Sequence, residues 1–287
     1  MSVNYYLLSI LFFITISTKA QTTEKARIRV KYRFIHVRDT TDRQRPYTED
    51  LVLLIGQSSS AYLSEDEQRQ IELRNKELKE QISKSTNPNS LDLVITGTRP
   101  VSSAEYFQFL SIRKLFIREK LNNDYLTEEP LPLINWKISN DKMMINGFQC
   151  QKATAHFRGR DYIAWFCADF PIQVGPWKLN GLPGLIMQAE DVKKEVVFQF
   201  KGLEDITDKD LLIKIPGGWV KATRKDVDRL LELQRKDPAA YAKLPAGKVS
   251  GVLGDVNPSR VNSIRVNSPV VNFGKKINNP IELPEKK

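Results

Sequence analysis

Arg158, Arg160 and Asp161 are the polar side chains whose spacing best suits binding chemistry, because they cluster between two apolar segments. Two arginines separated by a single residue could clamp a phosphate or a carboxylate through paired N–H donors. The simpler alternative is a solvated turn in which an arginine pairs with the aspartate and adds little to stability. Either way, the pattern predicts a charged turn.

Groups able to perform catalysis do not form a recognisable set. The two histidines, His36 and His156, stand in no spacing typical of metal ligands. Neither a glycine-rich phosphate loop nor a nucleophile elbow is present. Carboxylates are abundant, but their spacing does not show that two converge as a glycosidase requires. We therefore predict no catalytic residue, no metal site and no cofactor.

A β-hairpin must position the arginine pair. Gly147–Phe157 and Tyr162–Phe170 are strand-like segments separated by a short polar turn. A two-residue loop of Arg158 and Gly159 is favoured, because glycine at the second position suits a type I′ turn. A loop shifted by one residue, to Gly159 and Arg160, is the alternative.

The favoured loop places the two cysteines opposite each other. If Phe157 faces Arg160, the same register pairs Cys150 with Cys167. Opposed residues of a non-hydrogen-bonded pair have Cα atoms about 4.5 Å apart, which a disulfide can bridge. We therefore expect a Cys150–Cys167 disulfide. Two free, buried thiols are the alternative, and the shifted loop would put the cysteines on a diagonal.

An irregular segment, Pro171 to Gly184, follows the hairpin, with proline and glycine too frequent for a regular element. Leu182–Gly184 suits a type II turn. The side chains of Trp177, Leu179 and Leu182 have two interpretations. They plug one end of the core, or they form the lip of an apolar binding groove.

These segments together resemble the GLPGLI family of exported Bacteroidetes proteins. The matching strings cover about 45 residues and comprise Cys150–Thr154, Phe157–Arg160, Ala164–Phe166, Gly175–Leu179 and Gly181–Ile186. The resemblance implies an exported protein, and the family has no established activity that it could transfer. Cys167 departs from the family pattern, so the expected disulfide would be particular to this protein.

The first residues predict a secretory leader. Tyr5–Ile16 is a short apolar run, and Thr18–Ala20 is similar to the small-x-small pattern that precedes cleavage. An uncleaved anchor is the alternative, although the run is short for a membrane span. We expect export to the periplasm or cell envelope of a Gram-negative bacterium.

The net charge of +10 bears on partners. Such a charge suggests nucleic acid in a cytosolic protein, but export argues against nucleic acid here. Acidic lipid headgroups, lipopolysaccharide and acidic glycans are the partners that the charge suits, and a solvated basic surface is the simpler alternative. We expect contact with a membrane to be peripheral at most.

The remaining sequence predicts a β-rich α+β fold. Residues 27–34, 50–56, 59–63, 91–96, 135–139, 185–190 and 196–200 are expected to be strands, residues 113–118 alternate like one, and residues 122–132 are expected to form a loop. Ser64 and Thr223 are predicted to cap helices through about residues 83 and 235.

We predict a single twisted antiparallel sheet or half-barrel with a few peripheral helices, the Thr223 helix lying against its apolar face. Residues 1–20 are assigned to the leader, 21–256 to one β-rich domain and 257–287 to a basic extended or disordered tail. The expected function is non-enzymatic binding of an apolar ligand or an outer-membrane protein through the Trp177–Leu182 loop. A hydrolase acting on envelope glycans or peptides is the alternative.

Overall fold

The computed structural model of the chain describes residues 23–85, 91–96, 99–245, 261–267 and 277–285. The predicted leader lies outside the described residues. No helix in the described ranges has both the length and the apolar character needed to cross a bilayer.

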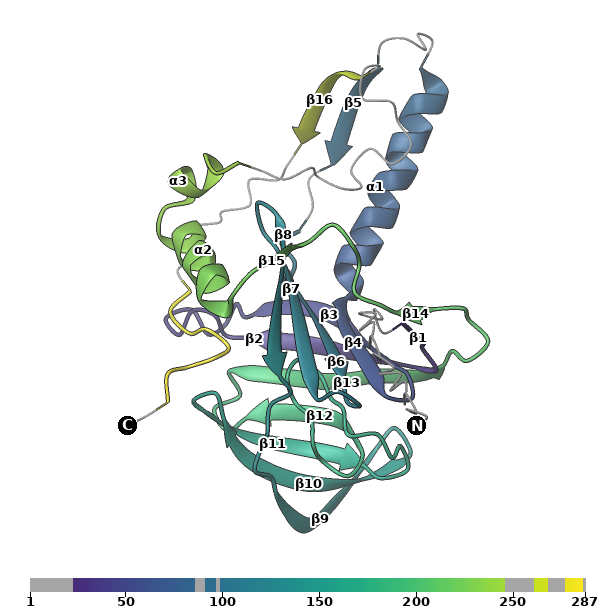
Figure 1. Cartoon of the computed structure of the whole chain (residues 1–287), viewed down its shortest axis with the longest axis vertical. Helices are drawn as coiled ribbons and strands as arrows, with labels where there is room; N and C mark the ends of the chain where they lie inside the picture. The colour runs from purple at the N-terminus through teal and green to yellow at the C-terminus, as the bar shows by residue number, and fades with distance from the viewer. Residues whose placement is uncertain (1–22, 86–90, 97–98, 246–260, 268–276, 286–287) are drawn as a thin grey trace, which may run out of the picture.

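The fold is built on one 12-stranded sheet with the order β15-β8-β7-β6-β4-β3-β2-β13-β12-β11-β10-β9 (Figure 1). All of its pairings are antiparallel except that of β15 with β8. Its strands are β2 (Ile28–His36), β3 (Tyr47–Ile55), β4 (Ser59–Ser64), β6 (Ala104–Phe109), β7 (Lys114–Lys120), β8 (Asp124–Pro130), β9 (Lys137–Ile145), β10 (Phe148–Phe157), β11 (Arg160–Cys167), β12 (Leu185–Asp191), β13 (Val196–Asp205) and β15 (Val220–Lys221). This arrangement confirms the predicted fold class.

In the described parts of the chain, three helices and two small sheets accompany the main sheet. The helices are α1 (Glu65–Lys84), α2 (Arg224–Lys236) and α3 (Pro238–Ala242). The small sheets pair β1 (Glu24–Lys25) with β14 (Leu212–Ile213), and β5 (Leu91–Thr96) with β16 (Val261–Asn267). Ser64 caps α1 as predicted, since its hydroxyl accepts the Glu67 N–H at 2.9 Å.

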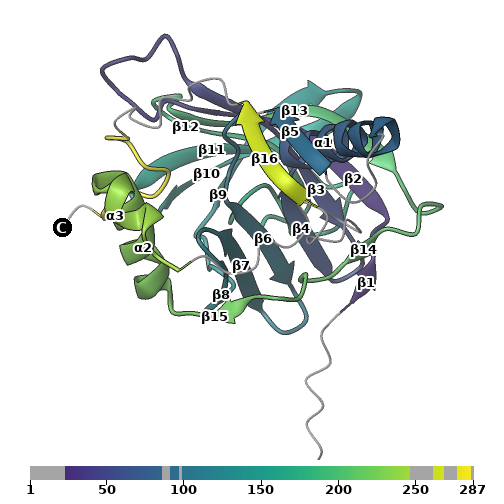
Figure 2. The ribbon, with the colours of Figure 1, turned by 90° about the horizontal axis from the view of Figure 1, so that it is seen from above.

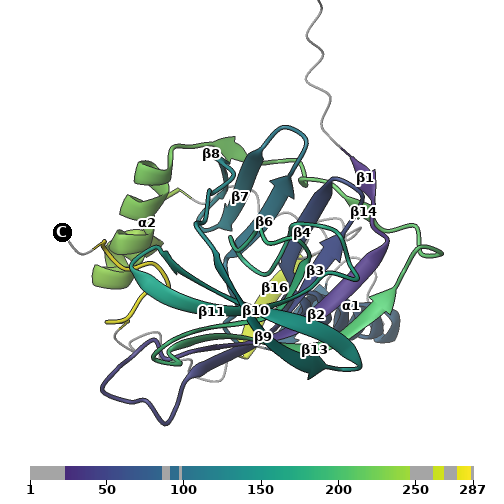
Figure 3. The same cartoon turned by 90° about the horizontal axis from the view of Figure 1, so that it is seen from below.

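The main sheet is strongly curved (Figures 2 and 3), and its strands point alternate side chains into the core. In β2, the side chains of Val30, Tyr32 and Phe34 point inward and the intervening residues are more exposed. Turned views of the molecule show the sheet bending so strongly that β10 and β11 lie across the interior from β4 and β6 (Figures 2 and 3). The result is the half-barrel form of the prediction.

The loop between β11 and β12 fills the concave face of the sheet. The side chains of Trp177, Leu179 and Leu182 are at most 1% exposed and belong to the main core cluster. The prediction that the Thr223 helix covers this face is therefore wrong. Of the residues in α2, Val227 alone is buried, and the helix lies to one side of the sheet (Figure 1).

Two strand predictions need correction. Residues 122–132, expected to be loop, contain β8, which pairs along its whole length with β7. The strand expected at 135–139 is β9, which extends to Ile145 and ends in a second tight turn at Asn146–Gly147. Cross-strand pairing stabilises both segments despite their polar composition.

Part of the predicted tail is ordered. Within residues 257–287, the structure describes β16, which pairs with β5 in parallel, and residues 277–285. We call residues 277–285 the C-terminal segment. It has an extended, irregular backbone and contacts the tip of the β10–β11 hairpin.

Candidate functional site

The β10–β11 hairpin has the favoured register. Phe157 pairs with Arg160, and Cys150 pairs with Cys167. The two loop residues have positive φ angles, 52° at Arg158 and 71° at Gly159, as a type I′ turn requires. The register prediction is confirmed.

The disulfide prediction is wrong in this structure, because Cys150 and Cys167 are both free, buried thiols. The Cys150 Sγ lies 3.7 Å from the Phe148 carbonyl on its own strand. Burial raises the pKa of the Cys150 thiol to about 12 and also raises that of Cys167. The apolar core therefore holds both groups as thiols, which do not act as nucleophiles.

The turn before β12 differs from the predicted type II turn. The Gly184 N–H donates to the Leu182 carbonyl at 2.7 Å, which closes a three-residue turn around Pro183. The glycine is required by close approach, since a Cβ there would lie 2.3 Å from the Cys167 carbonyl oxygen. The backbone of the loop thus lies directly against the hairpin at Cys167.

The loop is held from several directions. The Gln108 amide donates to the Trp177 carbonyl at 3.2 Å, and the Trp136 indole donates to the Asn180 carbonyl at 2.8 Å. The Tyr32 hydroxyl donates to the Ile186 carbonyl at 2.7 Å, just beyond the loop. Trp177 itself has a φ angle of 57°, which is rare for a residue with a side chain. The loop is thus a rigid plug.

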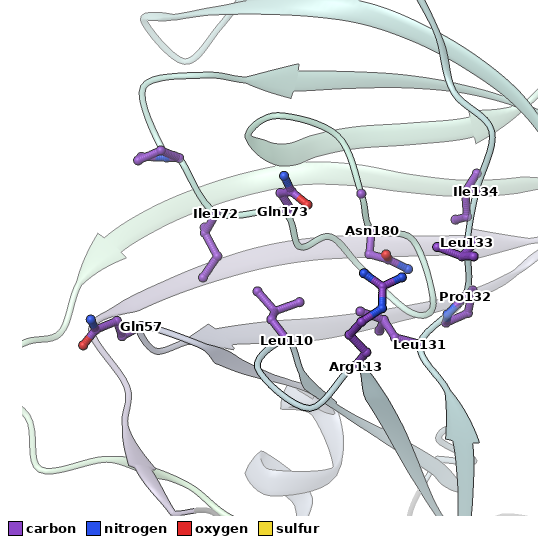
Figure 4. A pocket seen from close by; sticks show the side chains of 12 residues that line it. Gln57, Leu110, Arg113, Leu131, Pro132, Leu133, Ile134, Ile172, Gln173 and Asn180 are labelled. Carbon is purple, nitrogen blue, oxygen red and sulfur yellow. The ribbon is translucent and has the colours of Figure 1, made fainter.

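A cavity of about 420 Å³ lies beside this loop (Figure 4). Its lining combines apolar side chains with a few polar groups. The lining residues are Gln57, Leu110, Arg113, Leu131, Pro132, Leu133, Ile134, Pro171, Ile172, Gln173, Asn180 and Gly181. The volume falls in the range typical of small-molecule sites. Loop residues Asn180 and Gly181 form part of the wall, whereas the three predicted apolar side chains lie in the core.

Arg113 is the charged residue of the cavity lining. It ends the β6–β7 turn with a φ angle of 51°, and its carbonyl accepts the Leu131 N–H at 2.9 Å. Its guanidinium points across the cavity toward Asn180 (Figure 4) and forms no ion pair within the described part of the chain. Leu133, which also lines the cavity, is 80% exposed.

The predicted arginine pair is divided between two environments. Arg160 is 3% exposed and is enclosed by carboxylates and the C-terminal segment. Arg158 remains partly exposed, with its Nε 3.7 Å from Glu282 and an Nη 3.8 Å from Glu129. The two guanidinium groups thus differ in burial, and both lie close to the C-terminal segment.

One exposed cluster of titratable groups lies at the hairpin tip. His156 contacts Asp161 at 2.6 Å and Glu285 at 2.8 Å, and both carboxylates raise the pKa of the imidazole. Among the described residues, no three His, Cys, Asp or Glu side chains are arranged to hold a metal ion.

These features define a curved β-sheet protein with a loop-filled core and a cavity beside the loop. The family described as "Protein of unknown function (Porph_ging)", which is the GLPGLI family, has a model that matches residues 158–188. The chain thus carries the GLPGLI sequence signature in the hairpin and the loop. No curated protein matches the chain.

The fold has counterparts among solved structures. Two structures of PNGF-II, in P21 and C2 space groups, superpose with TM-scores of 0.50 and 0.48 at 12% identity. The matches cover 73% of this chain and 34% and 33% of the PNGF-II chains, so the chain spans about a third of their length. At this identity the likeness concerns the fold alone.

Proposed function

We propose that this protein acts in the cell envelope by binding a small amphipathic anion in the cavity beside the 171–184 loop, without catalysing a reaction. The observation that carries the proposal is that Arg113, which forms no ion pair with the described residues, lines a cavity together with aliphatic side chains and amides. An apolar wall accepts a hydrocarbon chain, and a guanidinium binds a carboxylate or phosphate.

The aliphatic side chains in the cavity lining suit the hydrocarbon tail of such a ligand. Leu110, Leu131, Ile134 and Ile172 contribute aliphatic side chains to the cavity. Transfer of each CH₂ group of a ligand from water to such a wall is worth about 0.8 kcal/mol. The amides of Gln57, Gln173 and Asn180 supply polar groups that would orient a headgroup.

The same lining disfavours the hydrolase alternative at this site. None of the twelve residues that line the cavity is an aspartate, a glutamate or a histidine. These side chains, together with lysine, tyrosine and cysteine, which the lining also lacks, perform most general acid–base catalysis. Binding therefore suits this chemistry better than hydrolysis.

A second candidate, a protein partner added at a sheet edge, is favoured by β9. This nine-residue strand ends the strand order of the main sheet, and Ile138 and Met144 on it are 47% and 61% exposed. An open edge of this length can receive a strand from another protein.

Isothermal titration calorimetry with octanoate and 1-octanol tests the leading proposal. The wild-type chain is expected to bind octanoate at least about 10-fold more tightly than octanol, because a charge-assisted hydrogen bond contributes about 1.5–3 kcal/mol. Arg113→Gln should remove this preference, and Arg113→Lys should keep part of it. Absence of binding to either probe at millimolar concentration, or a preference that survives Arg113→Gln, would contradict the proposal.

A further inference from the structure

The C-terminal segment is bound to the β10–β11 hairpin as a peptide ligand is bound to a receptor. Arg160 makes the central contacts. Its Nε donates to the Ile281 carbonyl at 2.9 Å, and one Nη donates to the Asn279 Oδ1 at 2.6 Å and to the Pro280 carbonyl at 2.7 Å. Three acceptors on consecutive residues of the segment thus bind the Nε and one Nη of the guanidinium.

Carboxylates hold the guanidinium in place from the other side. The second Nη of Arg160 donates to Asp191 at 2.7 Å and to Glu195 at 3.2 Å. All three side chains are at least 92% buried. Asp191 also accepts the N–H groups of Glu195 and Val196, at 2.6 and 2.9 Å. The receptor side of the site is therefore preorganised by groups outside the segment.

Asn279 is recognised on every polar atom of its side chain. Its amide nitrogen donates to the Val37 carbonyl at 2.7 Å and to Glu195 at 3.1 Å. Its backbone carbonyl accepts from the His36 Nε2 at 2.8 Å. Because Asn279 is only 4% exposed, a different side chain would leave buried polar groups unpaired.

Glu282 provides a second anchor, in a cationic site that belongs to the β11–β12 loop and the hairpin turn. The Lys178 ammonium is buried and lies 2.8 Å from the Glu282 carboxylate. Arg158 lies on the other side of the same carboxylate, at 3.7 Å. Glu129 of β8 lies 3.5 Å from the same ammonium, so the segment supplies the nearer of two anionic partners for this buried charge.

The hairpin turn is shaped to admit the segment backbone. The Leu283 N–H donates to the Arg158 carbonyl at 3.0 Å, and a Cβ at Gly159 would lie 2.6 Å from the Leu283 carbonyl oxygen. Gly147 occupies the equivalent position in the β9–β10 turn, with a φ angle of 86°, and a Cβ there would meet nothing within 4 Å. Glycine is thus needed at position 159 for contact as well as for its φ angle.

Four of the residues that bind the segment, Arg158, Gly159, Arg160 and Lys178, lie within the stretch matched by the family model. We infer that the GLPGLI signature of this chain forms a recognition site for an extended peptide with asparagine and glutamate three residues apart. In this structure the chain's own segment Asn279–Glu282 occupies the site.

Peptide binding to the full-length chain tests this inference. The probe is a fluorescein-labelled peptide with the sequence of residues 277–287, and the receptor is a chain whose own segment is weakened by Asn279→Ala and Glu282→Ala. The wild-type chain should bind the probe poorly, because a tethered segment competes at an effective concentration in the millimolar range. The double variant should bind it at least about 30-fold more tightly by fluorescence anisotropy.

Matched variants separate recognition from a general loss of structure. A probe carrying the same two substitutions should not bind the double variant. Adding Gly159→Ala should abolish binding of the unmodified probe, whereas adding Gly147→Ala should not. If the double variant does not fold, the single variant Glu282→Ala serves as the receptor. A folded receptor that binds neither probe, or binds both equally, would overturn the inference.

Discussion

The Arg160 guanidinium donates a 2.6 Å hydrogen bond to the Asn279 side chain, joining two residues 119 positions apart in the chain. This contact links the hairpin of the family signature to a segment whose sequence predicts a tail. It also links the candidate recognition site to the stability of the core, because the same guanidinium pairs with Asp191 and Glu195.

Substitution of Arg160 should therefore destabilise the protein strongly. Arg160→Gln leaves the buried Asp191 carboxylate without its cation and Glu195 with Arg43 alone, and we expect a loss of about 3–5 kcal/mol in the free energy of unfolding. Urea denaturation measures it. Arg43→Gln is the matched control, since Arg43 also pairs with Glu195, at 2.8 Å, but is half exposed, and its loss should cost less than about 1 kcal/mol. Similar losses for both variants would contradict this account.

The two type I′ turns give a prediction about the C-terminal segment. Gly147→Ala and Gly159→Ala both place a Cβ at positive φ, at a cost of about 1–2 kcal/mol. Gly159→Ala should cost more, because its Cβ also displaces the Leu283 backbone. Hydrogen exchange should show faster exchange at Leu283 in Gly159→Ala than in Gly147→Ala, and equal rates would argue against the contact.

His36 should make stability fall in mild acid. Burial, aided by Arg38 and Arg160, lowers the pKa of the imidazole to about 4, against the opposing effects of the Asn279 carbonyl and Glu195. Below about pH 6.5 the unfolded chain binds a proton that the folded chain does not bind until about pH 4. The free energy of unfolding should therefore drop by up to about 3 kcal/mol across this window.

His36→Gln keeps a donor for Asn279 and removes the titration, so the wild-type curve should fall relative to the variant curve between pH 6.5 and 4. His156 has the opposite sign, since its raised pKa makes its contribution present below about pH 6.5 and lost as the pH rises through the folded value. Because His156 is present in both chains, the difference between the curves isolates His36. Parallel curves would contradict the prediction.

The two core cysteines should be inert in the native protein. With a pKa of about 12, roughly one Cys150 thiol in ten thousand is ionised at pH 8. An aromatic disulfide reagent should modify neither cysteine in buffer and both in urea. Intact mass spectrometry after alkylation under denaturing, non-reducing conditions should show two adducts, and a chain without adducts would instead indicate a disulfide.

Local chemistry made the hairpin and the helix starts predictable. Glycine at the second loop position selected the register of β10 and β11, and the hydroxyls of Ser64 and Thr223 marked where α1 and α2 begin. In each case the decisive interaction lies within a few residues along the chain, so a single sequence contains it.

The site depends on contacts that a sequence pattern does not display. The cavity is lined by four separate parts of the chain, around Gln57, Arg113, Leu133 and Gln173. Asn279 lies in a stretch whose composition is that of a polar tail. It is held in place by partners more than 80 residues away, such as Glu195. The unusual feature of Arg113 is its positive φ angle, which depends on tertiary packing and therefore cannot be recognised from the sequence.

The distance along the chain between Arg160 and Asn279 sets a minimum delay in biosynthesis. Ribosomes add about 5–20 residues per second, so at least about 6–24 s separate the synthesis of Arg160 from that of Asn279. During that interval the guanidinium can pair with water and, once residues 191–195 exist, with their carboxylates. The hydrogen bonds between Arg160 and the C-terminal segment therefore form only after residue 279 has been synthesised. Until that point the recognition site on the hairpin has no segment to bind.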